Sequence, residues 1–411
     1  MNYLSRLKRE FSFFHGNYLL LIASWLIMDL ADEIPFSFFE LYVIELGGTV
    51  AIIGFINFSL KIAFAAVCFP GGYIADKFGR RGIIVFATLA NGLCHLTYAL
   101  APDWRYILLA LVIGNLTRIS NPALQAITAD SLPPKKRGLG FSIQQITMEL
   151  TSTPAPLIAT MMFDYFGFIP GMRIAYAISA SVYFISSLMR LRLTETLENA
   201  EKISMREILL AFPRSYVASF KMLFTIPKTL LYLIITNNIL SFATSFFGSY
   251  IIVYATSDLG LSKSEWGIIL TIQAIITTLC VIPIGKAIDI FGAKKMMIIF
   301  NILLIVTVLL IIFANFTSLS VIMPVMGLAF SSNGVASQKL IASLTQRNLR
   351  GKMAGLFRFF GLIVGGVSGL IGGLTYENTA HGNVFIIGAA ILILGTLVLI
   401  RFVHPPEQEE L

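Results

Sequence analysis

Long apolar runs, separated by short polar segments, extend along nearly the whole chain. Most runs contain about 20 residues or more, the length that an α-helix needs to cross the roughly 30 Å hydrocarbon core of a bilayer. The strands of a membrane β-barrel would instead show short segments of alternating apolar and polar residues. We therefore predict an all-α polytopic membrane protein with twelve transmembrane helices, at roughly 17–45, 50–75, 82–101, 104–130, 138–164, 170–190, 229–255, 264–288, 295–315, 318–343, 351–376 and 382–402.

The predicted helices form two groups of six on either side of a long polar segment, and the second group repeats the first. A repeat at a fixed offset indicates two equivalent structural units, here two pseudo-symmetric six-helix bundles. At a constant offset of 213 residues, Gly72, Asp76 and Gly79 recur as Gly285, Asp289 and Gly292. The predicted parts are a cytoplasmic N-terminal segment at 1–16, bundles at 17–190 and 229–402, a cytoplasmic central loop at 191–228 and a cytoplasmic tail at 403–411.

Composition and charge placement support a membrane protein. Hydrophobic residues make up 56% of the chain and charged residues 13%, about half the ~25% that is usual in soluble domains. With the N-terminus inside, the outer loops contain only Arg105, Arg173 and Lys263 of the 30 Lys and Arg residues. The positive-inside rule then places both termini in the cytoplasm, with the chain in the plasma membrane. This asymmetry explains the net charge of +8 without a nucleic-acid partner.

A charged turn between the second and third predicted helices carries the signature Gly72-x-x-x-Asp76-Lys77-x-Gly79-Arg80-Arg81. With twelve predicted helices in two repeated halves and a long central loop, the chain resembles the major facilitator superfamily of secondary transporters over nearly its whole length. The resemblance implies two six-helix bundles around a central cavity that opens alternately to each side. Rocking of the two repeats about a site near the membrane midplane is the mechanism expected of such a fold.

The resemblance also implies that this turn is a conformational latch. Gly72 and Gly79 would permit tight turns and close helix approach, and Asp76 would face the N-terminus of the eleventh helix. Arg80 would pair with Asp130, and the alternative is that the charges only enforce topology. The positions equivalent to Arg80 and Asp130 in the second half are both alanine. The predicted latch residues are Gly72, Asp76, Lys77, Gly79, Arg80, Arg81 and Asp130, with Gly285, Asp289 and Gly292 in the repeat.

Four acids in the first predicted helix are candidates for proton coupling. Asp29, Asp32, Glu33 and Glu40 are spaced so that all four lie near one face of a continuous helix, with Pro35 between them. Asp29, Asp32 and Glu33 lie near the middle of the predicted span. An ionised side chain there costs about 3 kcal/mol or more unless it is paired, hydrated or neutralised, and such residues mark substrate or ion pathways. A permanent structural ion pair is the alternative, and Na⁺ in place of H⁺ remains open because clustered carboxylates serve both ions.

Three more ionisable residues lie deep in predicted helices of the first half. Arg118 lies at matching depth in the fourth helix and is the expected counter-charge for Asp29, Asp32 or Glu33. Its role stays open between binding an anionic substrate, modulating the acid and pure structure. Lys61 and Glu149 would extend the charge network across the first bundle, or else snorkel or form fixed pairs.

The second half offers amides instead of acids, so proton handling is predicted for the first half. The amides expected to face the cavity are Asn237, Asn238, Gln273 and Asn333. In the eleventh predicted helix, glycines recur at every fourth position and form a flat face for close helix approach, either sliding or static. These glycines are Gly361, Gly365, Gly369 and Gly373.

Taken together, these features predict a proton-coupled secondary transporter of a small organic solute, and not an enzyme. Export of an amphipathic or cationic compound is favoured because acids outnumber bases among the first-half candidates. Uptake of an organic anion through Arg118 and Lys61 is the alternative, and a non-transporting receptor on the same fold is the hypothesis of another class. The fifth helix has Thr153-Pro154-Ala155-Pro156 in place of the glycine-rich signature of many drug/proton antiporters. Neither a cofactor nor a metal is expected, because no phosphate-binding loop occurs and the four His are scattered; a monomer in a lipid bilayer is expected.

Overall fold

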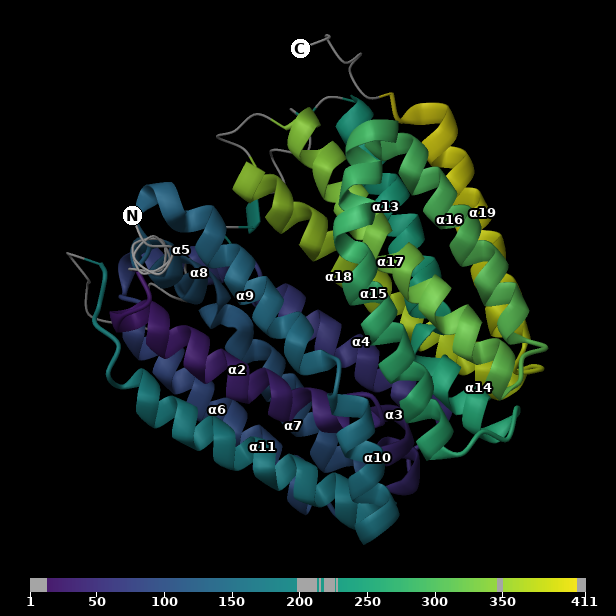
Figure 1. Cartoon of the computed structure of the whole chain (residues 1–411), viewed down its shortest axis with the longest axis horizontal. Coiled ribbons are helices and arrows are strands. Elements are labelled where there is room, and N and C mark those ends of the chain that lie inside the picture. Colours follow the sequence, from purple (N-terminus) through teal and green to yellow (C-terminus); the bar gives the residue numbers. More distant parts are fainter. Residues whose placement is uncertain are drawn as a thin grey trace, which may run out of the picture. The chain divides into compact units, whose positions relative to one another are not determined.

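The computed structural model describes residues 13–197, 228–345 and 350–404, with a few isolated positions between 213 and 226. Every regular element in this part of the chain is helical (Figure 1). The first six spans are α2 (Gly16–Phe36) with α3 (Phe39–Glu45), α4 (Val50–Val67) with α5 (Pro70–Lys77), α6 (Arg81–Leu100), α7 (Trp104–Leu116) with η1 (Thr117–Ser120) and α8 (Asn121–Asp130), α9 (Arg137–Ser152) with α10 (Ala155–Phe166), and α11 (Phe168–Arg190). The second six are α13 (Lys228–Phe247) with η3 (Gly248–Tyr250) and α14 (Ile251–Ser257), α15 (Lys263–Phe291), α16 (Ala293–Ile311), α17 (Phe316–Leu344), α18 (Arg350–Asn378) and α19 (Asn383–Phe402).

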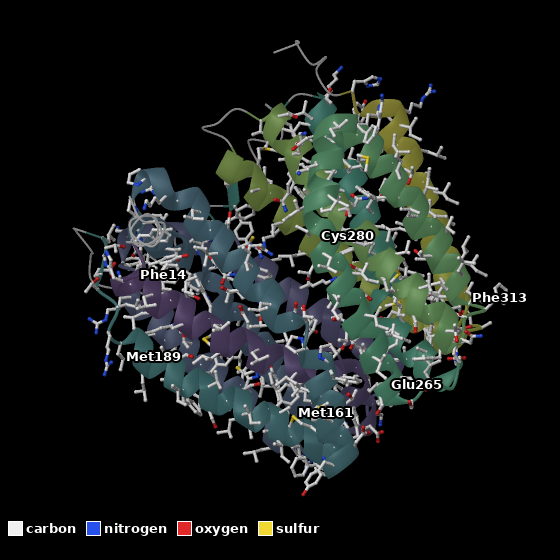
Figure 2. All side chains as sticks on the ribbon, in the orientation of Figure 1. Phe14, Met161, Met189, Glu265, Cys280 and Phe313 are labelled. Atoms are coloured by element: carbon white, nitrogen blue, oxygen red, sulfur yellow. The ribbon has the colours of Figure 1, made fainter. Side chains whose placement is uncertain are left out.

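Ten helices in the described part are long and apolar enough to cross a membrane. The first and fifth predicted spans are outside this set. In the first span α2 contains three acids, and in the fifth span α9 is separated from α10 at Pro154. Large apolar side chains are exposed in both units, and Phe313, in the turn after α16, is 87% exposed (Figure 2). A lipid environment accounts for this exposure, and the predicted all-α polytopic fold is confirmed.

The described helices group into two compact units. The first comprises 1–36 and 66–216, and the second comprises 37–65 and 217–411. The hairpin α3–α4 therefore packs within the second unit, although it follows α2 directly in the chain. The predicted division at a central loop, 191–228, stays a prediction because most of that loop lies outside the described residues, as do the segments 1–12 and 405–411.

A break in the first span explains how the hairpin leaves the first unit. Helix α2 ends at Phe36, one residue after Pro35, and α3 begins at Phe39. Proline has no N–H and cannot bond to the carbonyl four residues earlier, which is that of Ala31. The Ser179 hydroxyl of α11 donates to this carbonyl at 2.7 Å and lies 3.1 Å from the Ala175 carbonyl of its own helix. A side chain of a neighbouring helix therefore satisfies the group that proline leaves unbonded.

Helices α2, α6 and α11 lie side by side in the first unit (Figure 1). Gly92 allows α6 and α11 to approach closely, because a Cβ there would lie 2.9 Å from the ring of Phe184. The buried residues Leu21 and Ile84 belong to the apolar core that α2 and α6 share. These three helices form the frame in which the polar residues of the first unit lie.

The glycine face of α18 packs in the second unit against α4 and α13. A Cβ at Gly365 would lie 2.9 Å from Lys61 Nζ, and one at Gly373 would lie 2.9 Å from the Val50 carbonyl oxygen. The tightest position is Gly372, where a Cβ would lie 2.1 Å from the Phe246 carbonyl oxygen. Gly361 and Gly369 have looser surroundings, with the nearest atoms at 3.9 Å and 3.5 Å. Close approach therefore depends most on positions 365, 372 and 373.

Ser179→Ala should destabilise the protein by about 1–3 kcal/mol, because it leaves the buried Ala31 carbonyl without its donor. Pro35→Ala restores an N–H for that carbonyl, so the cost of Ser179→Ala should be much smaller in the Pro35→Ala background. Thermal melting of the purified variants measures both effects. The matched control is Ser181→Ala, since this exposed hydroxyl bonds only to the Ala177 carbonyl of its own helix. Equal costs of Ser179→Ala in the two backgrounds would contradict the explanation.

Candidate functional site

The carboxylate of Asp32 is the centre of the polar cluster in the first unit. The Tyr183 hydroxyl of α11 donates to its Oδ2. His95 Nε2 of α6 lies 3.3 Å from Oδ1, and the His95 ring stacks on Tyr183 with centroids 4.7 Å apart. The Asp32 side chain is about one-third exposed, with a relative accessibility of 34%. An acid at predicted mid-membrane depth thus contacts an imidazole and a phenol in direct succession.

A buried arginine faces the second acid of the cluster. Arg190, the last residue of α11, is only 2% exposed. Its Nε donates to Ser24 Oγ at 3.1 Å and its Nη1 to Thr88 Oγ1 at 2.8 Å. The charges of Arg190 and Asp29 attract each other. Sequence analysis missed Arg190 because an arginine at a predicted cytoplasmic helix end looks like a topology signal.

Arg118 occupies a helical irregularity in the fourth span. It belongs to the 3₁₀ turn η1, and Pro122 lacks the N–H that would bond to the Arg118 carbonyl in an α-helix. Its charge acts on Asp32, as expected of the predicted counter-charge. Glu33 follows Asp32 in α2, and the side chain of Glu149 lies outside the described residues.

Two predicted members of the first-half network lie elsewhere. Glu40 is in α3, beyond the break after Pro35, and hydrogen-bonds with Ser249 in η3. Lys61 in α4 donates to Ser245 Oγ of α13 at 2.9 Å. The predictions that Glu40 shares a helical face with the other acids, and that Lys61 extends the first-bundle network, are therefore wrong. The Glu40 prediction assumed a continuous first span, whereas α2 ends at Phe36. The Lys61 prediction assumed that the second span packs in the first bundle, whereas residues 37–65 belong to the second unit.

The four predicted amides lie in the second unit, with different neighbours. Asn237 accepts from the Ser337 hydroxyl of α17 at 2.8 Å, whereas Asn333 is buried and hydrogen-bonds with Asn301 of α16. Gln273 packs against Gly327 of α17. Asn238 lines an apolar cavity of about 490 Å³ between α13, α18 and α19. Asn333 is thus held by its own bundle.

The latch region shows the predicted ion pair. Arg80 Nη1 contacts Asp130 Oδ2 and also donates to Thr196 Oγ1 at 2.8 Å. Gly79 has φ +82°, as its predicted tight turn requires. The close approach expected at Gly72 occurs instead at Gly71, where a Cβ would lie 2.7 Å from the Ile119 carbonyl oxygen.

The other latch residues are placed as follows. A Cβ at Gly72 would meet no described atom within 4 Å, and the Asp76 side chain lies outside the described residues. Lys77 Nζ lies 5.9 Å from the Tyr73 ring centroid and 5.7 Å from that of Phe78.

The repeat keeps an ion pair with the charges exchanged. Lys339 Nζ of α17 lies 2.6 Å from Asp289 Oδ1 near the end of α15, whereas the first half has its cation in the turn and its acid in the fourth span. Gly292 has φ +86°, matching Gly79, while Gly285 has no described neighbour within 4 Å of a Cβ.

Glu195 also contacts the predicted latch region of the first half and was not predicted. Its Oε2 accepts the backbone N–H groups of Arg80 at 2.8 Å and Arg81 at 2.9 Å, at the N-terminus of α6. Arg81 donates through Nη2 to the Leu191 carbonyl at 2.5 Å. Partial burial raises the pKa of Glu195, but backbone N–H groups of Arg81, Leu197, Arg80 and Thr196 outweigh it and lower the pKa below the ordinary value. A carboxylate at a helix N-terminus is also stabilised by the helix dipole.

Comparisons with known proteins agree with this architecture. The Major Facilitator Superfamily matches residues 20–255 and 233–411. The multidrug resistance protein MdtG of Salmonella arizonae is 25% identical over 394 residues, covering 92% of this chain and 93% of the relative. MdtG of Klebsiella pneumoniae is 25% identical over 406 residues, covering 95% and 94%.

Two solved structures share the fold. The nucleoside transporter NupG has a TM-score of 0.74 at 16% identity, covering 94% of this chain and 98% of that one. A bacterial homologue of the human lysosomal transporter Spinster, in an inward-facing and occupied conformation, has a TM-score of 0.70 at 14% identity, covering 93% and 95%.

The fold and the charges within it define a polytopic membrane transporter. The chain belongs to the major facilitator superfamily. It is a secondary transporter, and the predicted class of protein is confirmed.

Glu195→Gln tests the cap of α6. The folded-state pKa of Glu195 is depressed, so its stabilisation is present above the unfolded value of about 4.5 and is lost as pH falls through the folded value. We expect Glu195→Gln to melt below the wild type at pH 7, with the difference shrinking as pH falls below about 4.5. Asp164→Asn, at an exposed acid of α10, is the control. A gap between Glu195→Gln and wild type that is unchanged from pH 7 to pH 4 would argue against the cap.

Proposed function

We propose that this transporter exports amphipathic or cationic organic compounds in exchange for protons. The observation that carries the proposal is Asp32, a carboxylate at predicted mid-membrane depth in contact with His95 and Tyr183. The curated relatives named as multidrug resistance proteins support the direction and the breadth of substrate. Uptake of an organic anion would need Arg118 and Lys61 to bind one ligand, and Lys61 Nζ donates to Ser245 Oγ instead.

The proton step follows from the cost of charge in a membrane. An ionised Asp32 requires its hydrogen-bond donors and the charge of Arg118, whereas a protonated Asp32 does not. Loading a proton therefore weakens the electrostatic links between α2, η1 and α11, and releasing it restores them. Asp29 beside Arg190 provides a second acid in the same bundle. In this mechanism the charge state of α2 selects which packing of the bundle is more stable.

The hairpin α3–α4 supplies a gate on the predicted outer side. Asn57 Nδ2 donates to Ser249 Oγ at 3.0 Å, one helical turn before the contact of Lys61 with Ser245. Nearer the predicted outer surface, Glu377 Oε2 of α18 accepts from Thr49 Oγ1 and from the Ala51 N–H, each at 2.8 Å.

The gate is held by polar contacts on several elements, with Lys263 Nζ 3.2 Å from Glu45 Oε1 as a further one. The hairpin is covalently continuous with α2 and α5 of the first unit. In the proposed gate, opening towards the outside moves the hairpin with α2 and α5, which breaks these bonds, so stronger bonds favour the closed state.

Asp32→Asn tests proton coupling directly. Asparagine keeps the size and polarity of the side chain but cannot take up a proton. In proteoliposomes with an imposed pH gradient, we expect ethidium transport by this variant to fall at least tenfold below wild type. Dye–dye exchange without a gradient should fall much less, because that exchange needs no net proton movement. Asp164→Asn should match wild type in both assays, and gradient-driven transport by Asp32→Asn at the wild-type rate would refute the role of Asp32.

Glu377→Gln should favour the outward-open state, since it removes the charge that holds the N-terminus of α4. The measurement is labelling of Asn57→Cys by a membrane-impermeant maleimide, in a background with alanine at Cys68, Cys94 and Cys280. We expect Glu377→Gln to raise the labelling rate severalfold.

The matched control for the gate is Asp103→Asn. Asp103 also caps a helix at the predicted outer side, since its Oδ1 accepts from the Arg105 N–H at the start of α7, but it does not touch the hairpin. Equal labelling rates in wild type, Asp103→Asn and Glu377→Gln would show that the Glu377 contact does not gate access.

A further inference from the structure

Polar residues continue from Asp32 towards the predicted outer end of the first unit. His95 contacts Tyr98 edge-to-face, with centroids 5.4 Å apart, and lies 6.1 Å from the Tyr176 ring. Tyr98 and Tyr176 contact each other at 5.2 Å. All three rings are buried or nearly so, between α6 and α11. Apolar side chains usually pack between two membrane helices. Here four adjacent rings carry polar atoms, those of His95, Tyr98, Tyr176 and Tyr183, which indicates a function beyond packing.

The same polar file continues towards the predicted cytoplasmic end. Tyr183 adjoins Asp32, Asp29 lies one helical turn earlier in α2, and Arg190 reaches Ser24 and Thr88. The sequence spacing produces this alignment. Residues seven apart lie on one helix face, as do Tyr176, Tyr183 and Arg190 on α11 and Thr88 and His95 on α6.

Several polar atoms in this file are buried without a hydrogen-bond partner among the described residues. They include Asp29 Oδ2, His95 Nδ1 and Arg190 Nη2. Buried polar atoms in folded proteins are nearly always satisfied, and ordered water supplies the partner where protein does not. Unsatisfied atoms in the middle and at the inner end of the file are therefore positions for bridging water.

We infer that this file between α2, α6 and α11 is the proton path to Asp32, and that it runs inside the first unit. The inference rests on the proposed proton coupling and specifies its route. Its polar groups come from four elements of the first unit. They are Asp29, Asp32 and Ser24 on α2, Thr88, Cys94, His95 and Tyr98 on α6, Tyr176, Tyr183 and Arg190 on α11, and Arg118 on η1.

The proton reaches Asp32 in two transfers, first to His95 and then from His95 to the carboxylate. A hydrated proton (H3O⁺) at His95 Nδ1 gives its proton to the ring, which becomes the imidazolium and leaves a neutral water. The Nε2–H bond then breaks as an O–H bond forms at Asp32 Oδ1, which lies 3.3 Å away. Asp32 Oδ1 has no hydrogen-bond partner among the described residues, so the proton passes when the two groups come into line or through one bridging water. The imidazole returns to its neutral form, with its remaining proton on Nδ1, and Asp32 becomes neutral. Ring rotation or loss of that Nδ1 proton to water and rebinding resets the tautomer for the next transfer.

His95→Phe is the decisive variant, because it keeps an aromatic ring against Tyr183 and removes both ring nitrogens. The probe is ethidium in proteoliposomes that also contain a pH-sensitive dye. We expect proton flux coupled to ethidium to fall at least tenfold, while gradient-free ethidium exchange stays within twofold of wild type. Thr97→Val, on the exposed side of α6, is the matched control and should leave both fluxes unchanged.

The outcomes separate the route from the function. If wild type shows proton flux coupled to ethidium and His95→Phe shows the same flux, the proposed path is wrong and proton-coupled export still holds. If wild type itself shows no gradient-driven ethidium transport, the proposed function fails and the inference falls with it. If His95→Phe does not fold, Tyr98→Phe decides, since it removes a single hydroxyl: a severalfold slower coupled flux supports the file, and an unchanged flux overturns it.

Discussion

A charge inside a hydrocarbon layer must find its partners within the protein, and the first unit is arranged around that requirement. Transfer of an unpaired charged group to the middle of a bilayer costs about 3 kcal/mol or more. Asp32 meets the requirement with the Tyr183 hydroxyl, the His95 ring and the charge of Arg118. Arg190, which is almost fully buried, meets it with two hydroxyl groups and the attraction of Asp29. The packing of α2 against α6 and α11 is therefore inseparable from the ionisation of its acids.

The second determinant is one proline. Pro35 removes a backbone donor, α2 ends one residue later at Phe36, and α3 begins at Phe39. The acids before the break stay in the first unit, while Glu40 and Lys61 beyond it contact the second. Ser179 bonds to the carbonyl that the proline leaves free, so the break costs less than an unsatisfied buried group would. A residue of the first span thereby lies in the first or the second unit according to whether it precedes or follows the break after Phe36.

The duplicated halves have kept their turns and exchanged their charges. Gly79 and Gly292 both adopt left-handed backbone conformations, which only glycine adopts without strain. The turn cation and helix acid of the first half, Arg80 and Asp130, are replaced by alanines, yet Asp289 and Lys339 form a pair between the eighth and tenth spans. Each bundle has an ion pair between two elements at the same end. The two bundles differ in which of the two elements carries the positive charge.

Sequence alone determined the helices, the repeat and the family resemblance, because apolar length, a fixed offset and turn glycines are local properties of the chain. The family resemblance also implied the pair of Arg80 with Asp130, which the structure contains. It did not predict that Glu40 and Lys61 lie in the second unit. It also did not predict that His95 and Tyr183 contact Asp32, that Arg190 attracts Asp29, or that Glu195 caps α6. Those partnerships depend on which faces of α2, α6 and α11 meet. Only tertiary packing decides that, because a histidine or tyrosine in an apolar helix has the same local pattern whether it faces lipid, a neighbouring ring or a carboxylate.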